Sequence, residues 1–113
     1  MSDCIFCKIV DREIPANVVY EDDSIMCFHD VSPQAPVHVL LIPKKHIESM
    51  DRLLDEDKDL MGHMLLKIKE ITELLGLKNG YRVVNNCGSD GMQQVMHFHF
   101  HILGKRKMIW PPG

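Results

Sequence analysis

The sequence predicts an α+β fold, in which a mainly antiparallel five-stranded sheet carries one short N-terminal helix and one long central helix. Short β-rich runs separated by turn signals fill much of the chain, one long stretch has helical periodicity, and no βαβ alternation occurs. The length of 113 residues suits a single domain spanning residues 1–113, with one compact core.

The first elements are a short helix and three strands. The segment "CIFCKIVDREIP" carries apolar residues at helical spacing and stops before a proline, which predicts a short helix containing Ile5, Phe6, Ile9 and Val10. The period then changes to that of a strand. The runs "NVVYE", "SIMCFHD" and "VHVLLIP" predict strands at about 17–21, 24–29 and 37–42.

The second half begins with the long helix, predicted from Asp55 to Gly76. Its apolar residues recur every three or four positions: Leu60, Met64, Ile68, Ile71 and Leu75. Asp55 is expected to cap its start, and Gly76 to supply the left-handed C-terminal stop. Two further strands are predicted at 81–86 and 95–103, joined by the loop "CGSDGMQ".

Composition and charge exclude several classes of function. With 13 Lys and Arg against 16 Asp and Glu, the net charge of -3 offers no footprint for nucleic acid. No apolar run is long enough to span a membrane, and the start lacks the pattern of a secretory signal, so a cytoplasmic protein is expected. Thiols stay reduced there, which argues against disulfides between Cys4, Cys7, Cys27 and Cys87.

The segment "VMHFHFHILG" places three histidines at alternate positions. On a strand His97, His99 and His101 share one face, while the other face is apolar and carries Met96, Phe98, Phe100 and Ile102. The histidines could be the polar residues of a half-exposed strand, the ligands of a metal, or nucleophiles that attack phosphorus. The spacing by itself does not separate the metal from the nucleophile.

The surrounding sequence resembles the histidine triad superfamily, whose hallmark is His-φ-His-φ-His-φ-φ with φ apolar. The match is "HFHFHIL", supported by "FHDVSPQAPVHVLLIPKKHI" and "VVNNCGSDGMQQV". The pieces "IPKKH", "GYR", "GSDG" and "WPPG" are similar to the Hint branch, the nucleoside phosphoramidate hydrolases. The resemblance implies a homodimer, formed through the long helix and a strand, that binds purine nucleotides and needs no cofactor for its chemistry.

The resemblance also implies roles for individual residues. His99 would attack the α-phosphorus of a purine nucleoside 5'-phosphoramidate and form a nucleotidyl-histidine, oriented by the backbone carbonyl of His97. His101 would face the phosphate and His38 would hold the histidine cluster. Asp30 would accept the ribose hydroxyls, Asn86 and Gln93 would lie beside the phosphate, and the apolar slot for the base would be Ile5, Phe6, Ile9, Phe28, Val31 and Leu40.

The Cys4-x-x-Cys7 pair suits half of a zinc site. Superfamily members with such a pair imply a structural zinc bound by Cys4, Cys7, His46 and His97. The loop before the stripe departs from the usual Gly-Gly-Gln-Ser of the branch, because Met92 stands at a glycine and Gln94 at a serine thought to assist the leaving amine. These departures leave open a nucleotide-binding sensor or scaffold with weak or no turnover. The histidine stripe itself leaves open a zinc hydrolase that uses it as ligands.

Overall fold

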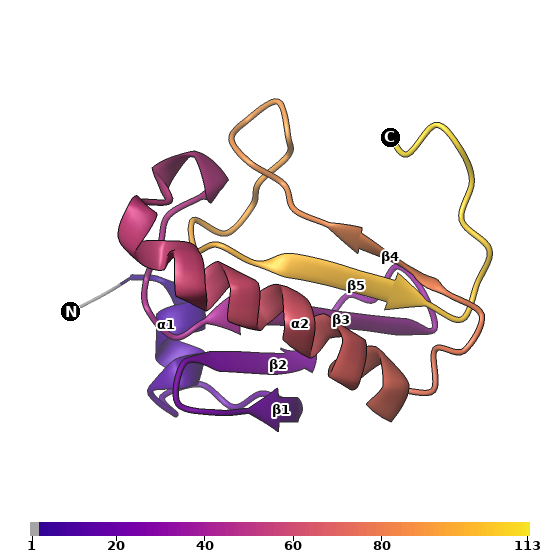
Figure 1. Ribbon diagram of the computed structural model, residues 1–113, viewed down its shortest axis with the longest axis horizontal. Helices are drawn as coiled ribbons and strands as arrows, with labels where there is room; N and C mark the ends of the chain where they lie inside the picture. The colour runs from indigo at the N-terminus through magenta and orange to yellow at the C-terminus, as the bar shows by residue number, and fades with distance from the viewer. Residues whose placement is uncertain (1–2) are drawn as a thin grey trace.

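The computed structural model describes residues 3–113, and within them five strands form one antiparallel sheet in the order β1-β2-β3-β5-β4 (Figure 1). The strands are β1 (Val18–Glu21), β2 (Ile25–His29), β3 (Val37–Pro43), β4 (Tyr81–Val84) and β5 (Phe100–Gly104). The helices are the short α1 (Ile5–Val10) and the long α2 (Lys58–Leu74). The predicted α+β architecture is therefore confirmed.

The sheet is covered by a helix on each face (Figure 1). Strands β2 and β3 are buried along most of their length, so alternate residues pack toward opposite faces. On one face α2 packs on a core that includes Met64, Ile68, Ile71, Val39, Leu41 and Ile102. On the other face Phe6 and Ile9 of α1 pack with the strand residues Met26, Phe28, Leu40 and Ile42. The site described below lies on the α1 face.

The long helix begins later than the sequence predicts. Residues Asp55–Asp57 form a 3-10 turn, and α2 starts at Lys58. Asp57 rather than Asp55 takes the position before the helix, where its buried carboxylate accepts hydrogen bonds from the Leu54 amide and the Lys45 ammonium. The predicted stop is confirmed, because Gly76 has a φ of 72°.

The predicted strand at 95–103 is too long at its start, since β5 begins at Phe100. The preceding residues leave β3 because the Phe98 amide donates to the Ile47 carbonyl instead of continuing the ladder. Phe98, Phe100 and Ile102 enter the core as predicted, whereas Met96 is 46% exposed and does not. Strand β4 likewise ends at Val84, so the predicted strand at 81–86 is two residues too long.

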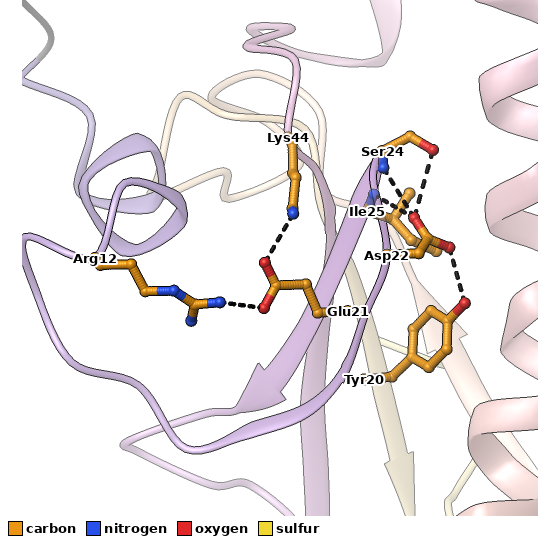
Figure 2. A network of polar contacts seen from close by, with 7 residues as sticks. All are labelled: Arg12, Tyr20, Glu21, Asp22, Ser24, Ile25 and Lys44. Atoms are coloured by element: carbon orange, nitrogen blue, oxygen red, sulfur yellow. Dashed lines mark hydrogen bonds and ion pairs between the residues drawn. The ribbon is translucent and has the colours of Figure 1, made fainter.

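The β1–β2 hairpin is tied to its surroundings by two carboxylates (Figure 2). Glu21 accepts from Lys44 and Arg12, and these bonds lower its pKa. Burial alone would raise the pKa of Asp22, but hydrogen bonds from Ser24, His63, Tyr20 and Ile25 outweigh it and lower the pKa. Because His63 belongs to α2, Asp22 joins the hairpin to that helix. In residues 3–113 no helix has the length and apolarity needed to cross a membrane.

Candidate functional site

The three histidines of the stripe lie at and just before the start of β5. His101 is on the strand, while His97 and His99 precede it and are almost fully buried. The His99 and His101 ring centroids are 5.0 Å apart, and Phe6 from α1 packs edge-on against the His99 ring at 5.2 Å. The alternation predicted from the sequence therefore brings His99 and His101 together, although only one of the two is in a strand.

The hydrogen bonding of His99 determines which ring nitrogen carries its proton. Its Nδ1 lies 2.6 Å from the backbone carbonyl oxygen of His97. A carbonyl only accepts, so Nδ1–H donates and the Nε2 of the neutral ring keeps its lone pair. Burial lowers the pKa of His99, which favours this neutral form. The ring is therefore held as a neutral base with a defined nucleophilic nitrogen.

His38 and His101 form a second hydrogen-bonded arrangement with its own defined protons. The Gln34 backbone amide donates to His38 Nδ1 across 3.0 Å, so the proton of neutral His38 is on Nε2. That Nε2–H donates to His101 Nδ1 across 2.9 Å, which leaves the His101 proton on its own Nε2. Burial, with the neighbouring His99 and His38, lowers the pKa of His101 to about 4, and burial also lowers the pKa of His38. His101 can thus donate one hydrogen bond into the site.

A cavity of about 900 Å³ opens beside these rings. It has an apolar part lined by α1 and the centre of the sheet, which includes all six residues of the predicted base slot: Ile5, Phe6, Ile9, Phe28, Val31 and Leu40. Its polar part includes the predicted residues Asp30, His38, Asn86, His99 and His101. Val31 is 98% exposed and lies at the rim. The mixture of one apolar and one polar part suits an elongated ligand with a flat apolar end.

Gln93 does not line this cavity. It is buried, its amide group donates to the Glu48 and Val95 carbonyls, and its side-chain oxygen accepts from the Gly88 amide. The residues of this loop that line the cavity are Met92, Gln94 and Val95. Met92 has a φ of 64°, the left-handed region that favours glycine, so the loop keeps this conformation with a strained residue.

The predicted metal ligands come together at the N-terminal side of α1. One ligand atom from each of Cys4, Cys7, His46 and His97 lies within 4.8 Å of the others. His97 Nδ1 is 3.2 Å from Cys4 Sγ, 3.6 Å from Cys7 Sγ and 3.2 Å from His46 Nδ1. Zn–S bonds of about 2.3 Å and Zn–N bonds of about 2.0 Å require ligand atoms roughly 3.3–3.8 Å apart in a tetrahedron. The cluster has that size.

The His97 ring faces this cluster with Nδ1, the nitrogen that is able to bind a metal. Its Nε2–H donates to the Pro43 carbonyl across 2.8 Å, so the Nδ1 that faces the cysteines carries a lone pair. Burial lowers the pKa of His97 to about 4, which keeps the ring neutral. The Cys7 amide also donates to Cys4 Sγ at 3.4 Å, which orients that sulfur at the start of α1. These residues fit a closed Cys₂His₂ zinc site.

A second group of metal-ligand residue types, Asp30, His38 and His101, fits a metal less well. The His38 nitrogen that faces this group is Nε2. Because the Gln34 amide donates to Nδ1, the proton of neutral His38 is on Nε2, which therefore has no lone pair for a metal. Asp30 Oδ2 lies 3.5 Å from the same nitrogen. The group is better described as a hydrogen-bond chain beside the cavity.

The sequence analysis missed two contributions to this site. The Gln34 main chain sets the proton of His38, and the Asn85 side chain donates to the His99 carbonyl across 2.9 Å. A main-chain donor leaves no signal in a sequence. Asn85 does leave one, since a polar residue follows an apolar strand there, but the resemblance to the family points to its neighbour Asn86.

Comparison with known proteins gives one consistent result. Residues 3–110 match the family described as "Scavenger mRNA decapping enzyme C-term binding". The chain is 54% identical over 111 residues to an uncharacterised HIT-like protein of Synechocystis, covering 98% of this chain and 97% of that one. It also matches the crystal structure of a HIT family hydrolase from Legionella pneumophila, with 49% identity, a TM-score of 0.96 and coverage of 98% and 100%. A histidine triad nucleotide-binding protein from Candida albicans is 34% identical, with a TM-score of 0.82 and coverage of 96% and 83%.

Proposed function

Because this chain belongs to the histidine triad superfamily, which includes the decapping-enzyme family and the HIT-like proteins it matches, we propose that it hydrolyses purine nucleoside 5'-phosphoramidates. The Legionella neighbour is named a hydrolase and the Candida neighbour a nucleotide-binding protein, which supports the general class of the proposal. Cleavage of a P–N bond and a nucleotidyl-histidine on His99 are the specific parts of the proposal.

One observation supports the proposal most strongly: the 2.6 Å hydrogen bond from His99 Nδ1–H to the His97 carbonyl. Attack on phosphorus needs an unprotonated nitrogen in a fixed direction. The bond holds the ring in the tautomer that leaves Nε2 free, and burial keeps the ring neutral. A histidine that was only a polar surface residue would require neither.

The cavity supplies a complementary partner for each part of a nucleotide. In the proposed complex the base lies among the apolar residues of α1 and β2, and Asp30 accepts the ribose hydroxyls. Asn86 and the Nε2–H of His101 donate to the phosphate oxygens. Gln93 acts on the phosphate side only by holding the loop, because its amide is engaged with the main chain.

The proposed reaction has two displacements at the same phosphorus. His99 Nε2 forms a bond to the α-phosphorus while the P–N bond to the amine breaks, and the departing nitrogen takes a proton from solvent. Gln94 lines the cavity, but its side-chain amide is a poor proton donor. Solvent is therefore the better source of the proton for the leaving amine. Water then attacks the phosphorus, the bond to His99 breaks, and a nucleoside 5'-monophosphate is released.

We also propose a structural zinc at Cys4, Cys7, His46 and His97. When bound, the ion would supply a crosslink between the start of α1, the segment after β3 and the segment before β5. The His97 ring would then be held by Pro43 on one side and by the cluster on the other, while its carbonyl orients His99. The metal would support the site without taking part in the chemistry.

Mass spectrometry of the intact protein, quenched without acid during turnover of adenosine 5'-phosphoramidate, tests the proposed function. We expect an added mass of one AMP that maps to His99. His99→Ala is expected to lower turnover at least about 1000-fold while AMP still binds. His63→Ala, a histidine outside the cavity, is the matched control and should retain turnover. Full hydrolysis by His99→Ala would refute the assignment.

A nucleotide-binding sensor with weak turnover is the second candidate, because Met92 and Gln94 line the cavity at the positions where the chain departs from the Hint branch. It predicts tight AMP binding and no adduct in the same experiment. A zinc hydrolase built on the stripe predicts instead that His99→Ala loses the metal. The His99 nitrogen that faces away from the His97 carbonyl is not part of either cluster of potential ligands in residues 3–113.

A further inference from the structure

Asn85 is the first residue after β4, and its side chain contacts the main chain of the proposed nucleophile. The Asn85 Nδ2 group donates to the backbone carbonyl of His99 across 2.9 Å. The ring of His99 is held separately, through Nδ1 and the His97 carbonyl. The ring and the main chain of His99 are therefore each held by a hydrogen bond from outside that residue.

The contact stands where the sheet would otherwise continue. Strands β4 and β5 pair from Tyr81 opposite Gly104 to Val84 opposite His101. The same register, extended by two residues, would place Asn86 opposite His99. The ladder stops at Val84 instead, and the Asn85 side chain supplies the donor to the His99 carbonyl. Asn86 is left out of the ladder and lines the cavity.

The same amide group has a cost to stability. Asn85 Oδ1 is buried, and among residues 3–113 it has no hydrogen-bond partner. A buried acceptor without a donor is destabilising, and leucine, which is similar in shape to asparagine, would avoid that penalty but would also remove the donor to the His99 carbonyl. The two effects oppose each other, so the amide group gives the fold little net stability. Unsatisfied polar groups are more often retained where function needs them.

We infer that Asn85 is a positioning residue, whose N–H group holds the main chain of His99 so that Nε2 faces the phosphorus in line with the leaving amine. The inference rests on the proposed function, because it takes His99 as the nucleophile. Asn85 itself touches no reacting atom. Its effect should therefore fall on the rate of attack and leave nucleotide affinity unchanged, since the cavity does not include Asn85.

Asn85→Leu tests this role, because it removes the donor at nearly constant shape. We expect kcat to fall about 10- to 100-fold, as for a small misplacement of a reacting group, and the melting temperature to change little, because the gain at Oδ1 offsets the lost hydrogen bond to the His99 carbonyl. KM should stay within about threefold. Asn85→Gln keeps a donor and should recover part of kcat. Asn79→Leu makes the same change in the exposed turn before β4 and should alter neither kcat nor KM.

A lower melting temperature with unchanged kcat in Asn85→Leu would overturn the inference, because it would make Asn85 purely structural. Nuclear magnetic resonance separates this result from failure of the proposed function. In ¹³C,¹⁵N-labelled protein, Asn85→Leu should shift the carbonyl carbon and the ring nitrogens of His99, whether or not the protein turns over. Unchanged His99 resonances would refute the positioning role. Absence of turnover in the native protein, with the His99 resonances shifted in Asn85→Leu, would refute the proposed function and leave Asn85 only as a residue that orients His99.

Discussion

His97 belongs to both candidate sites: its ring nitrogen Nδ1 lies 3.2 Å from Cys4 Sγ, while its backbone carbonyl accepts a hydrogen bond from His99 Nδ1–H at 2.6 Å. One residue, His97, therefore connects the predicted zinc site to the predicted nucleophile. Disturbing the cysteine cluster should therefore change the orientation of the His99 ring, although no residue of the nucleotide cavity is altered.

The first prediction concerns the metal. We expect native protein purified without added zinc to contain about one zinc per chain, and Cys7→Ser to contain far less, because three ligands rarely hold a structural zinc. Metal analysis measures this, and thermal unfolding should show that both Cys7→Ser and a chelator lower the melting temperature. Cys87→Ser, a cysteine outside the cluster, is the control. Native protein that lacks zinc and cannot be reloaded would contradict the prediction.

The second prediction concerns the protonation of His101, which should stay neutral well below pH 6. Its pKa of about 4, against 6.5 for an ordinary histidine, follows first from burial. Because the unfolded chain binds the proton more readily, folding stability should fall as the pH drops from about 6.5 toward 4. The ¹³Cε1 resonance, identified with His101→Gln, gives the titration directly. A midpoint near 6.5 would show that the ring is solvated.

A third prediction tests the corrected start of α2. Asp57→Asn should lower the free energy of unfolding at pH 7, because the bond from Lys45 and the Leu54 amide lower the pKa of Asp57. A carboxylate with a depressed pKa stabilises the fold above its unfolded pKa, near 3.8, and loses this contribution as the pH falls. The difference between native and variant protein in urea unfolding should therefore shrink below pH 4. Asp55→Asn should have little effect, and a larger effect than Asp57→Asn would restore the original prediction.

The fourth prediction concerns the homodimer. Leu65, Leu66 and Leu74 on α2 are more than half exposed, and the edge strand β4 exposes Tyr81 and Val83. Exposed leucines on a helix and an open sheet edge are both features that suit pairing with a second copy. Light scattering should give twice the 13.0 kDa mass of the chain. Leu66→Glu should shift this toward monomer, whereas Lys58→Glu at the start of the same helix should not.

The fifth prediction concerns the strained loop beside the cavity. Met92→Gly should raise the free energy of unfolding by about 1 kcal/mol, because glycine adopts positive φ without a clash of Cβ. Met96 is exposed as well but does not have positive φ, so Met96→Gly should lower stability instead. Urea unfolding measures both. A fall in stability for Met92→Gly would mean that the methionine side chain makes contacts that outweigh the strain.

The sequence predicted the elements well and their boundaries less well, for identifiable reasons. The apolar alternation of "VMHFHFHIL" predicts a strand from Val95, but β5 begins only at Phe100. The Phe98 amide donates instead to the carbonyl of Ile47, fifty-one residues earlier in the chain. Likewise Asp55 matches a helix cap by residue type, yet the Lys45 ammonium binds Asp57. In each case a contact distant in sequence competes with a local preference that has a similar energy.

The sequence by itself determined the α+β class, most of the core residues and the residue types of both candidate sites, because these follow from periodicity and from short patterns along the chain. Only the tertiary structure decided where the histidine protons are. Each ring takes its tautomer from a partner on another segment or from a main-chain group: His97 from Pro43, His38 from Gln34, His99 from the His97 carbonyl. A neutral imidazole has two tautomers of similar energy, so the hydrogen bond that the fold provides makes the choice.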